Sequence, residues 1–295
     1  MIDDDALLPG APLSTAVRAA SALLAEAGVP SPRRDAELLL AHALGLDLKA
    51  LHHAMLLGNG EVPEGYVMLL EQRSERIPLQ HLTGVAHFRR LDLSVGPGVF
   101  IPRPETEEVA QWAIDRCREL QAEGLDEPLV VDLGTGSGAI AASLAQEVPG
   151  ARVHAVELSP LAIAWAERNM RPHGVALHQG DLRSALPELN GTVDIVVSNP
   201  PYIPREAVPR EPEVAEHDPH MALYGGGEDG MDLPLAAAAS AARLLRGGGF
   251  FIMEHAEVQA PWLAARLGKD PRWEAVQTHQ DLNGKDRATS ARRAS

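Results

Sequence analysis

The segment Val131-Asp132-Leu133-Gly134-Thr135-Gly136-Ser137-Gly138 decides the fold. A short apolar run that predicts a strand opens it, and the helical pattern of residues 139–146 follows it. Glycines at alternate positions let the backbone turn sharply and approach a ligand, and the first N–H groups of a helix are free to bind one. The segment therefore predicts a ligand-binding loop at a strand-to-helix turn of an α/β domain.

The spacing of these glycines distinguishes between ligand classes. Dinucleotide loops usually read G-x-G-x-x-G, whereas this loop reads G-x-G-x-G and follows Asp132. About 20 residues further on, Glu157 ends the next predicted strand, where an acid can accept hydrogen bonds from both hydroxyls of a ribose. Asp181 and Leu182 follow the third strand and can flank an adenine, one as an acceptor and one as an apolar lid. Together these residues predict a nucleoside site without a diphosphate, which favours S-adenosylmethionine over NAD.

A second motif, Asn199-Pro200-Pro201-Tyr202, follows the fourth predicted strand, at the edge where open α/β sheets bind ligands. The two prolines stiffen the backbone and lack N–H donors. A planar NH2 group needs two acceptors, which the Asn199 side-chain oxygen and the Pro200 carbonyl can supply, while Tyr202 offers a flat face. Such fixed dipoles stabilise the positive charge that moves to nitrogen as a methyl group arrives from a sulfonium. The motif therefore predicts methyl transfer to a planar NH2 group.

These motifs give a defined set of candidate residues. Asn199 and Pro200 are the expected catalytic residues, and Asn199–Tyr202 the expected substrate site. No metal site is expected. The residues expected to bind the cofactor are Asp132, Gly134, Thr135, Gly136, Ser137, Gly138, Glu157, Asp181, Leu182 and Asn199.

The acceptor is ambiguous from the motif alone, because the exocyclic amine of adenine is also a planar NH2 group. An enzyme that acts on a DNA base must flip the base and bind phosphates, which requires a basic surface. The formal net charge here is -15, aromatic residues make up 4% of the chain, and residues 203–230 are rich in Asp and Glu. These features favour a protein amide, while adenine N6 methylation of DNA or RNA and a cofactor-binding protein without catalysis remain alternatives.

The pattern of apolar residues divides the chain into three parts. Residues 1–76 predict a small all-helical domain, residues 77–104 a linker with a β-hairpin, and residues 105–295 the methyltransferase domain. The alternation of strands and helices from Leu129 onward predicts a Rossmann-like α/β fold with a mostly parallel sheet. Two segments near the end of the chain, 273–276 and 287–292, are expected to add an antiparallel edge.

The composition indicates an ordinary globular protein, with 45% hydrophobic and 23% charged residues. The single cysteine, Cys117, excludes an intrachain disulfide. The start, Met1–Asp5, is acidic and lacks the positive stretch of a signal peptide, and no apolar run is long enough to span a bilayer. A cytoplasmic protein without membrane association is therefore expected.

The chain resembles the PrmC/HemK family over nearly its whole length. Arg103-Pro104-Glu105-Thr106-Glu107 together with the Asn-Pro-Pro-Tyr motif is the most specific mark. Further marks are Asp35–Leu40, Pro78–Gly84, Ala222–Gly230 and Asp281–Arg287. Two departures, at His81 and at Glu254-His255-Ala256, are expected to affect local packing.

The resemblance implies a substrate and assigns roles to the motifs. Members of the family methylate the glutamine of the Gly-Gly-Gln motif in peptide chain release factors. Their helical domain helps to hold the release factor, their glycine loop binds S-adenosylmethionine, and their Asn-Pro-Pro-Tyr loop binds the glutamine. We therefore expect a monomeric glutamine N5-methyltransferase with release factors as partners and no direct contact with nucleic acid. Because a close relative methylates a glutamine in a ribosomal protein, that substrate is a further alternative.

Overall fold

The computed structural model describes residues 4–295; Met1–Asp3, part of the acidic start considered above, lie outside the described residues. The chain divides into two compact units. One comprises the chain up to Val85 together with Pro209–His217, and the other comprises Ala86–Val208 and Asp218–Ser295. The helical unit therefore includes a short segment that lies far downstream in the sequence.

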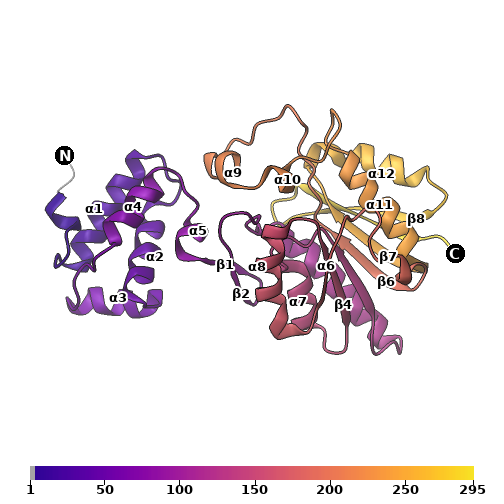
Figure 1. Ribbon diagram of the computed structural model, residues 1–295, viewed down its shortest axis with the longest axis horizontal. Helices are drawn as coiled ribbons and strands as arrows, with labels where there is room; N and C mark the ends of the chain where they lie inside the picture. Colours follow the sequence, from indigo (N-terminus) through magenta and orange to yellow (C-terminus); the bar gives the residue numbers. More distant parts are fainter. Residues whose placement is uncertain (1–3) are drawn as a thin grey trace. The chain divides into compact units, whose positions relative to one another are not determined.

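The helical unit consists of short helices (Figure 1), and they pack around a small apolar core. Leu24, Leu39 and Tyr66 are fully buried in it, and the Tyr66 hydroxyl donates to the carbonyl of Ala36 across 3.0 Å. The short helix α5 was not predicted, because Pro78 breaks the helical pattern of the sequence. The elements of the helical unit are η1 (Asp4–Leu7), α1 (Leu13–Glu26), α2 (Pro32–Leu44), α3 (Leu48–Leu57), α4 (Tyr66–Ser74), α5 (Leu79–Thr83) and α9 (Pro212–His217).

The second unit contains a seven-stranded sheet in the order β5-β4-β3-β6-β7-β9-β8. The first five strands in this order are parallel to one another. The strand β9 pairs antiparallel with both β7 and β8. This arrangement confirms the predicted Rossmann-like fold with its antiparallel edge. The strands are β3 (Leu129–Leu133), β4 (Arg152–Glu157), β5 (Ala176–Gln179), β6 (Val193–Ser198), β7 (Leu245–Glu254), β8 (Trp273–Gln280) and β9 (Asp286–Arg293).

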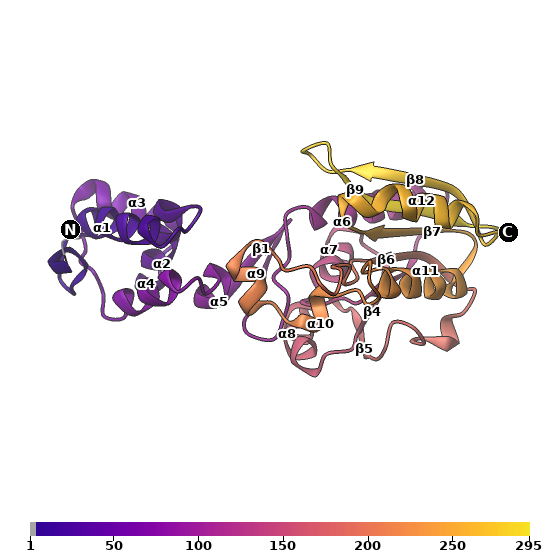
Figure 2. The same ribbon diagram turned by 90° about the horizontal axis from the view of Figure 1, so that it is seen from above.

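Helices cover both faces of this sheet (Figure 2). Side chains alternate along a strand, so Val130 belongs to the apolar core that includes side chains of α6, α7 and α8, whereas Val131 belongs to the opposite core with side chains of α11 and α12. Two helices of this unit, α12 and the short α10, were not predicted. The bounds are α6 (Thr106–Ala122), α7 (Ala139–Glu147), α8 (Pro160–Met170), α10 (His220–Leu223), α11 (Asp232–Leu244), α12 (Ala260–Gly268), η2 (Arg171–His173), η3 (Pro187–Leu189) and η4 (Glu257–Gln259).

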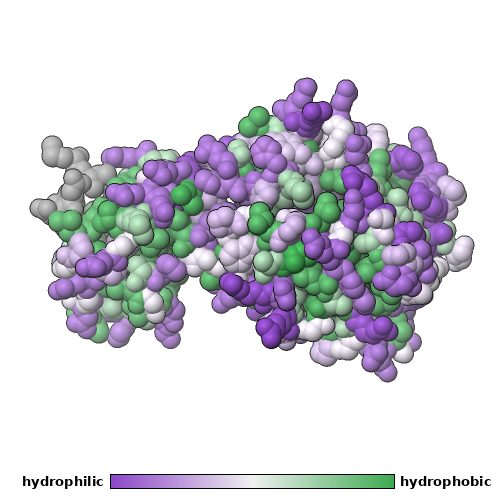
Figure 3. Space-filling view, viewed as in Figure 1, coloured by the Kyte–Doolittle hydropathy of each residue, from purple (hydrophilic) through white to green (hydrophobic). Residues whose placement is uncertain are grey.

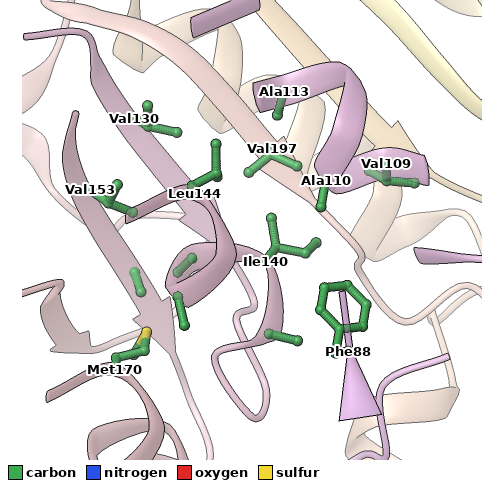
Figure 4. Packing of buried hydrophobic residues seen from close by; sticks show 14 of the residues in the cluster. Phe88, Val109, Ala110, Ala113, Val130, Ile140, Leu144, Val153, Met170 and Val197 are labelled. Atoms are coloured by element: carbon green, nitrogen blue, oxygen red, sulfur yellow. The ribbon is translucent and has the colours of Figure 1, made fainter. Parts of the chain in front are cut away.

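The predicted β-hairpin is present as β1 (Val85–Phe88) and β2 (Leu91–Ser94). Its buried side chains, Phe88 and Leu93 among them, join the core of the sheet unit. Figure 4 shows the Phe88 ring beside Ile140 and Ala110. The hairpin thus packs as part of the methyltransferase core from Ala86 onward.

The strand order places four loops at one edge of the sheet. The chain runs from β3 through β4 to β5 on one side, and then returns to β6 and β7 on the other side of β3. Ligands bind beyond the carboxyl ends of parallel strands where the order reverses in this way. The fold therefore gathers the loops after β3, β4, β5 and β6 at one place.

Hydrophilic and apolar residues are interspersed on the face drawn in Figure 3. Among residues 4–295, no helix has the length and apolar character that crossing a membrane requires.

Candidate functional site

The glycine loop after β3 has a backbone conformation that favours glycine. Gly134, Gly136 and Gly138 have φ angles of 78°, 58° and 85°, in the left-handed region that favours glycine. A Cβ atom at Gly138 would stand 2.7 Å from Cγ of Met170, so α8 packs directly against this turn. The loop is therefore close-packed on its inner side at Gly138.

Glu157, the last residue of β4, is bonded to this loop. Its Oε2 accepts the Gly136 N–H across 2.8 Å, and its Oε1 accepts the N–H groups of Leu158 and Ser159 at 2.9 and 2.8 Å. Burial raises its pKa, and these three backbone donors act in the opposite direction. Glu157 thus holds the glycine loop and the turn after β4 in one arrangement.

Asp132 lies beneath the loop and is fully buried. Burial raises its pKa to about 7, although the Thr135 hydroxyl donates to its Oδ2 across 2.6 Å. Ser137 is fixed by its carbonyl, which accepts from Asn169 Nδ2 at 2.9 Å. Asn169 was not among the predicted residues. Asp132 and Asn169 therefore set the shape of the loop from its buried side.

Asp181 and Leu182 follow β5, the strand beside β4. Leu182 lies next to the glycine loop, since its Cδ2 is 4.0 Å from the place of a Cβ on Gly134. Asp181 accepts from the backbone N–H of Arg183 at 2.9 Å and from its guanidinium at 3.0 Å. The predicted cofactor residues at the ends of β3, β4 and β5 thus occupy adjacent turns.

Asn199 stands at the end of β6, the neighbour of β3 on the other side. Its Nδ2 donates to Thr106 Oγ1 across 3.1 Å, and Thr106 in turn donates to Glu254 Oε2 across 2.7 Å. The Tyr202 hydroxyl donates to the other oxygen of Glu254 across 3.2 Å. Burial raises the pKa of Glu254 to about 7. From the sequence, Glu254 was expected to affect local packing, and Thr106 had no predicted role in the site.

The backbone of the Asn-Pro-Pro-Tyr loop is held by the segment that precedes α11 and by η4. A Cβ at Gly225 would stand 2.7 Å from the Pro201 carbonyl, and one at Gly230 would clash with the carbonyl of Tyr202. Gln259 Nε2 donates to that same Tyr202 carbonyl across 2.9 Å. These contacts explain why residues 225 and 230 are glycines.

The acidic segment after the loop divides between the two units. Residues 209–217 belong to the helical unit, and the remainder belongs to the sheet unit. Within the sheet unit, Asp218 forms an ion pair of 2.5 Å with Arg103, whose guanidinium also lies over the Phe100 ring. The sequence left open whether Arg103 contacts a neighbouring acid, a cofactor or a helix end. The structure pairs it with Asp218.

Comparisons with known proteins agree with this architecture. Residues 15–84 match the family model described as the PrmC N-terminal domain, and residues 110–215 match the one described as the methyltransferase small domain. The catalytic domain of hMettl16, solved in complex with an RNA hairpin, aligns with a TM-score of 0.50 at 14% identity, over 68% of this chain and 75% of that one. At this identity the likeness concerns the fold alone.

Two curated relatives match nearly the whole length. The chain is 49% identical over 282 residues to the release factor glutamine methyltransferase of Streptomyces coelicolor, covering 94% of this chain and 97% of the relative. It is 40% identical over 273 residues to the 4-amino-L-phenylalanine/4-methylamino-L-phenylalanine methyltransferase of Streptomyces pristinaespiralis, covering 92% of each. By its identity and coverage, the chain belongs to the release factor glutamine methyltransferase family.

Proposed function

We propose that this protein transfers a methyl group from S-adenosylmethionine to the side-chain amide nitrogen of the glutamine in the Gly-Gly-Gln motif of peptide chain release factors. The observation that carries the proposal is the orientation of the Asn199 side-chain amide. Because Thr106 holds its Nδ2, its Oδ1 is the atom that can accept a hydrogen bond from an incoming NH2 group. Membership of the family supports the same reaction, since the Streptomyces coelicolor relative is named for it.

The residues at the ends of β3 and β4 fit S-adenosylmethionine. Glu157 Oε2 accepts one N–H, so it retains a lone pair for a ribose hydroxyl. At Gly136, no atom of the described residues outside its immediate neighbours comes within 4 Å of the place of a Cβ, which leaves room for a ligand against the backbone. We infer that the loop and Glu157 hold the nucleoside, and that Asp181 and Leu182 flank its adenine.

The acceptor site compensates for the weak nucleophilicity of an amide. S-adenosylmethionine supplies an electrophilic methyl group on a sulfonium. The lone pair of the substrate amide is delocalised. Asn199 Oδ1 and the Pro200 carbonyl accept hydrogen bonds from the two N–H groups of that amide and so increase the electron density on nitrogen. The same two dipoles stabilise the positive charge that develops there. Tyr202 supplies a flat face for the planar group, and no strong general base is required, because the methylated nitrogen is acidic enough to lose its proton afterward.

The partners follow from this chemistry. A protein substrate suits a chain with a formal net charge of -15 better than a phosphate backbone does. We therefore propose release factors as the partners, with no direct contact with nucleic acid. We also propose that the enzyme is monomeric and works in the cytoplasm.

An arylamine is the second candidate acceptor. The Streptomyces pristinaespiralis relative is named as a methyltransferase of 4-amino-L-phenylalanine, whose ring NH2 group is conjugated as an amide NH2 group is. The two acceptors described above serve either group. A release factor differs from a free amino acid in being a protein, which the family's helical domain is expected to help to hold.

The experiment that tests the proposal is methyl transfer from labelled S-adenosylmethionine to a purified release factor. A matched release factor with alanine in place of the Gly-Gly-Gln glutamine is the control. Label on the first protein alone supports the reaction and the target residue. If neither protein is labelled while 4-amino-L-phenylalanine, a ribosomal protein, duplex DNA or structured RNA is, the chemistry of the loop is right and the proposed substrate is wrong.

A further inference from the structure

We propose that Glu254, acting through Thr106, fixes which end of the Asn199 amide faces the substrate. Glu254 is then a positioning residue for methyl transfer rather than a residue that touches the reacting atoms. The inference rests on the proposed function, because it concerns the side chain that is proposed to accept the substrate N–H.

The three side chains form a continuous chain of hydrogen bonds. Glu254 ends β7 and Thr106 begins α6, and their side chains meet at 2.7 Å in the interior, with 2% and 3% of each residue exposed. Thr106 then contacts Asn199 Nδ2 at 3.1 Å, and Asn199 is partly exposed at the site. An interior carboxylate is thus connected to the surface of the reaction site through one hydroxyl group.

The direction of this chain follows from donor and acceptor chemistry. An ionised carboxylate only accepts hydrogen bonds, so the single hydroxyl proton of Thr106 must point to Glu254. The lone pairs of the hydroxyl then accept from Asn199 Nδ2, and Oδ1 is turned toward the substrate. The opposite amide orientation would present N–H donors to a substrate NH2 group that also consists of donors, which is repulsive.

The second carboxylate oxygen acts on the same loop. It accepts from the Tyr202 hydroxyl, so Glu254 is bonded at both oxygens, directly or through Thr106, to the first and last residues of the Asn-Pro-Pro-Tyr motif. Arg287, which is bonded to Asp281, places positive charge near this carboxylate, and Glu105 places negative charge near it. One buried acid therefore positions both the acceptor and the flat face of the site.

Four substitutions test this inference, with kcat, the KM for release factor and the cofactor Kd as readouts. Glu254→Gln introduces an N–H donor that can reverse the direction of the hydrogen bonds between residues 254, 106 and 199. Thr106→Val removes the hydroxyl group that connects Glu254 to Asn199. Each should lower kcat by about 10- to 100-fold, while the cofactor Kd changes less than about 3-fold. Thr106→Ser restores the hydroxyl and should stay within about 3-fold of wild type. Thr289→Val is the matched control. Thr289 also has a buried hydroxyl group, which contacts His255 at 2.8 Å and does not take part in the hydrogen bonds between Glu254, Thr106 and Asn199.

A second readout observes the amide itself. In protein labelled with 15N asparagine, the Asn199 side-chain N–H signals are identified by their loss in Asn199→Ala. Exchange of one of these protons with solvent should be slow in wild type and Thr106→Ser, and at least about 10-fold faster in Thr106→Val and Glu254→Gln.

The outcomes separate the inference from the proposed function. A wild-type kcat in Glu254→Gln or Thr106→Val, or an equal loss in Thr289→Val, overturns the inference. If Glu254→Gln does not fold, the Val and Ser variants at position 106 decide. If wild type labels no release factor, the proposed function is wrong, and exchange of the Asn199 amide still decides the inference: unchanged exchange in both variants overturns it.

Discussion

The Arg73 guanidinium donates to Glu213 Oε1 across 2.9 Å, although the two residues are 140 positions apart in the chain. Arg73 also bonds Asp35 at 2.8 Å, and Arg76 donates to both oxygens of Glu213 at 2.8 and 2.6 Å. The helix α9 is therefore tied to α4 and, through Arg73, to α2. A segment that follows the Asn-Pro-Pro-Tyr motif completes the ion-pair network of the helical unit.

This network predicts a pH-dependent contribution to stability. Burial raises the pKa of Glu213, but hydrogen bonds from Arg76 and Arg73 outweigh it and lower the pKa from 4.5 to about 2. The carboxylate therefore stabilises the folded state above pH 4.5, and this stabilisation is lost as the pH falls from 4.5 toward 2. Glu213→Gln should reduce the free energy of unfolding at pH 7 by about 2 kcal/mol.

Urea unfolding followed by circular dichroism at pH 7 and pH 3 measures this difference. Glu216→Gln is the matched control, because Glu216 is an exposed carboxylate on the same short helix. Its stability should stay within about 0.5 kcal/mol of wild type. Equal losses in the two variants, or a loss at position 213 that is as large at pH 3 as at pH 7, would contradict the prediction.

The sequence predicted the sheet and its motifs well because these depend on local patterns. The glycine spacing around Gly134–Gly138 and the alternation of strands and helices are visible within short windows, and the structure confirms the fold that they predict. The roles of Thr106 and Glu254 could not be predicted in this way. They are 148 residues apart and meet because α6 begins where β7 ends. The place of residues 209–217 in the helical unit could not be predicted either, because it depends on contacts with Arg73 and Arg76, which are far away in the sequence.

Asn199→Ala should abolish most turnover and leave cofactor binding intact. The substitution removes the acceptor oxygen for the substrate N–H, and loss of one such preorganised group typically costs about 10²- to 10³-fold in kcat. Single-turnover methyl transfer measures the chemical step, and titration calorimetry measures the cofactor Kd. Asn283→Ala, at an exposed asparagine in the β8–β9 turn, is the control. Turnover at the wild-type rate in Asn199→Ala would contradict the proposal that this loop binds the substrate NH2 group.

Glu157→Gln should weaken cofactor binding more than it lowers kcat. The carboxylate accepts three backbone N–H groups, and an amide must turn its own N–H donors toward at least one of them. The loss of a hydrogen bond to a charged group is about 1.5–3 kcal/mol, so the cofactor Kd should rise by about 10- to 100-fold. Glu167→Gln, an exposed acid on α8, should leave the Kd unchanged. A wild-type Kd in Glu157→Gln would show that the ribose is held elsewhere.

The raised pKa of Glu254 leads us to expect opposite effects of pH on activity and on stability. Burial raises its pKa from 4.5 to about 7, with Thr106, Tyr202 and Arg287 favouring the ionised form and Glu105 opposing it. If the ionised carboxylate orients Asn199, kcat should fall as the pH is lowered through 7, since a protonated carboxyl can donate to Thr106 and release the amide. Glu254→Gln should lose this limb of the pH profile together with most of its activity.

The stability effect has the opposite sign. A carboxyl group with a raised folded-state pKa binds its proton more tightly in the folded protein, so its favourable contribution is complete below pH 4.5 and is lost as the pH rises toward 7. Glu254→Gln carries no titrating group at this position. Its stability relative to wild type should therefore increase between pH 5 and pH 8, and taking the difference cancels the similar titration of Asp132. Thermal unfolding of both proteins across this range provides the measurement. A relative stability that does not change with pH would mean that Glu254 stays in one protonation state throughout, and the low-pH limb of kcat would then need another titrating group.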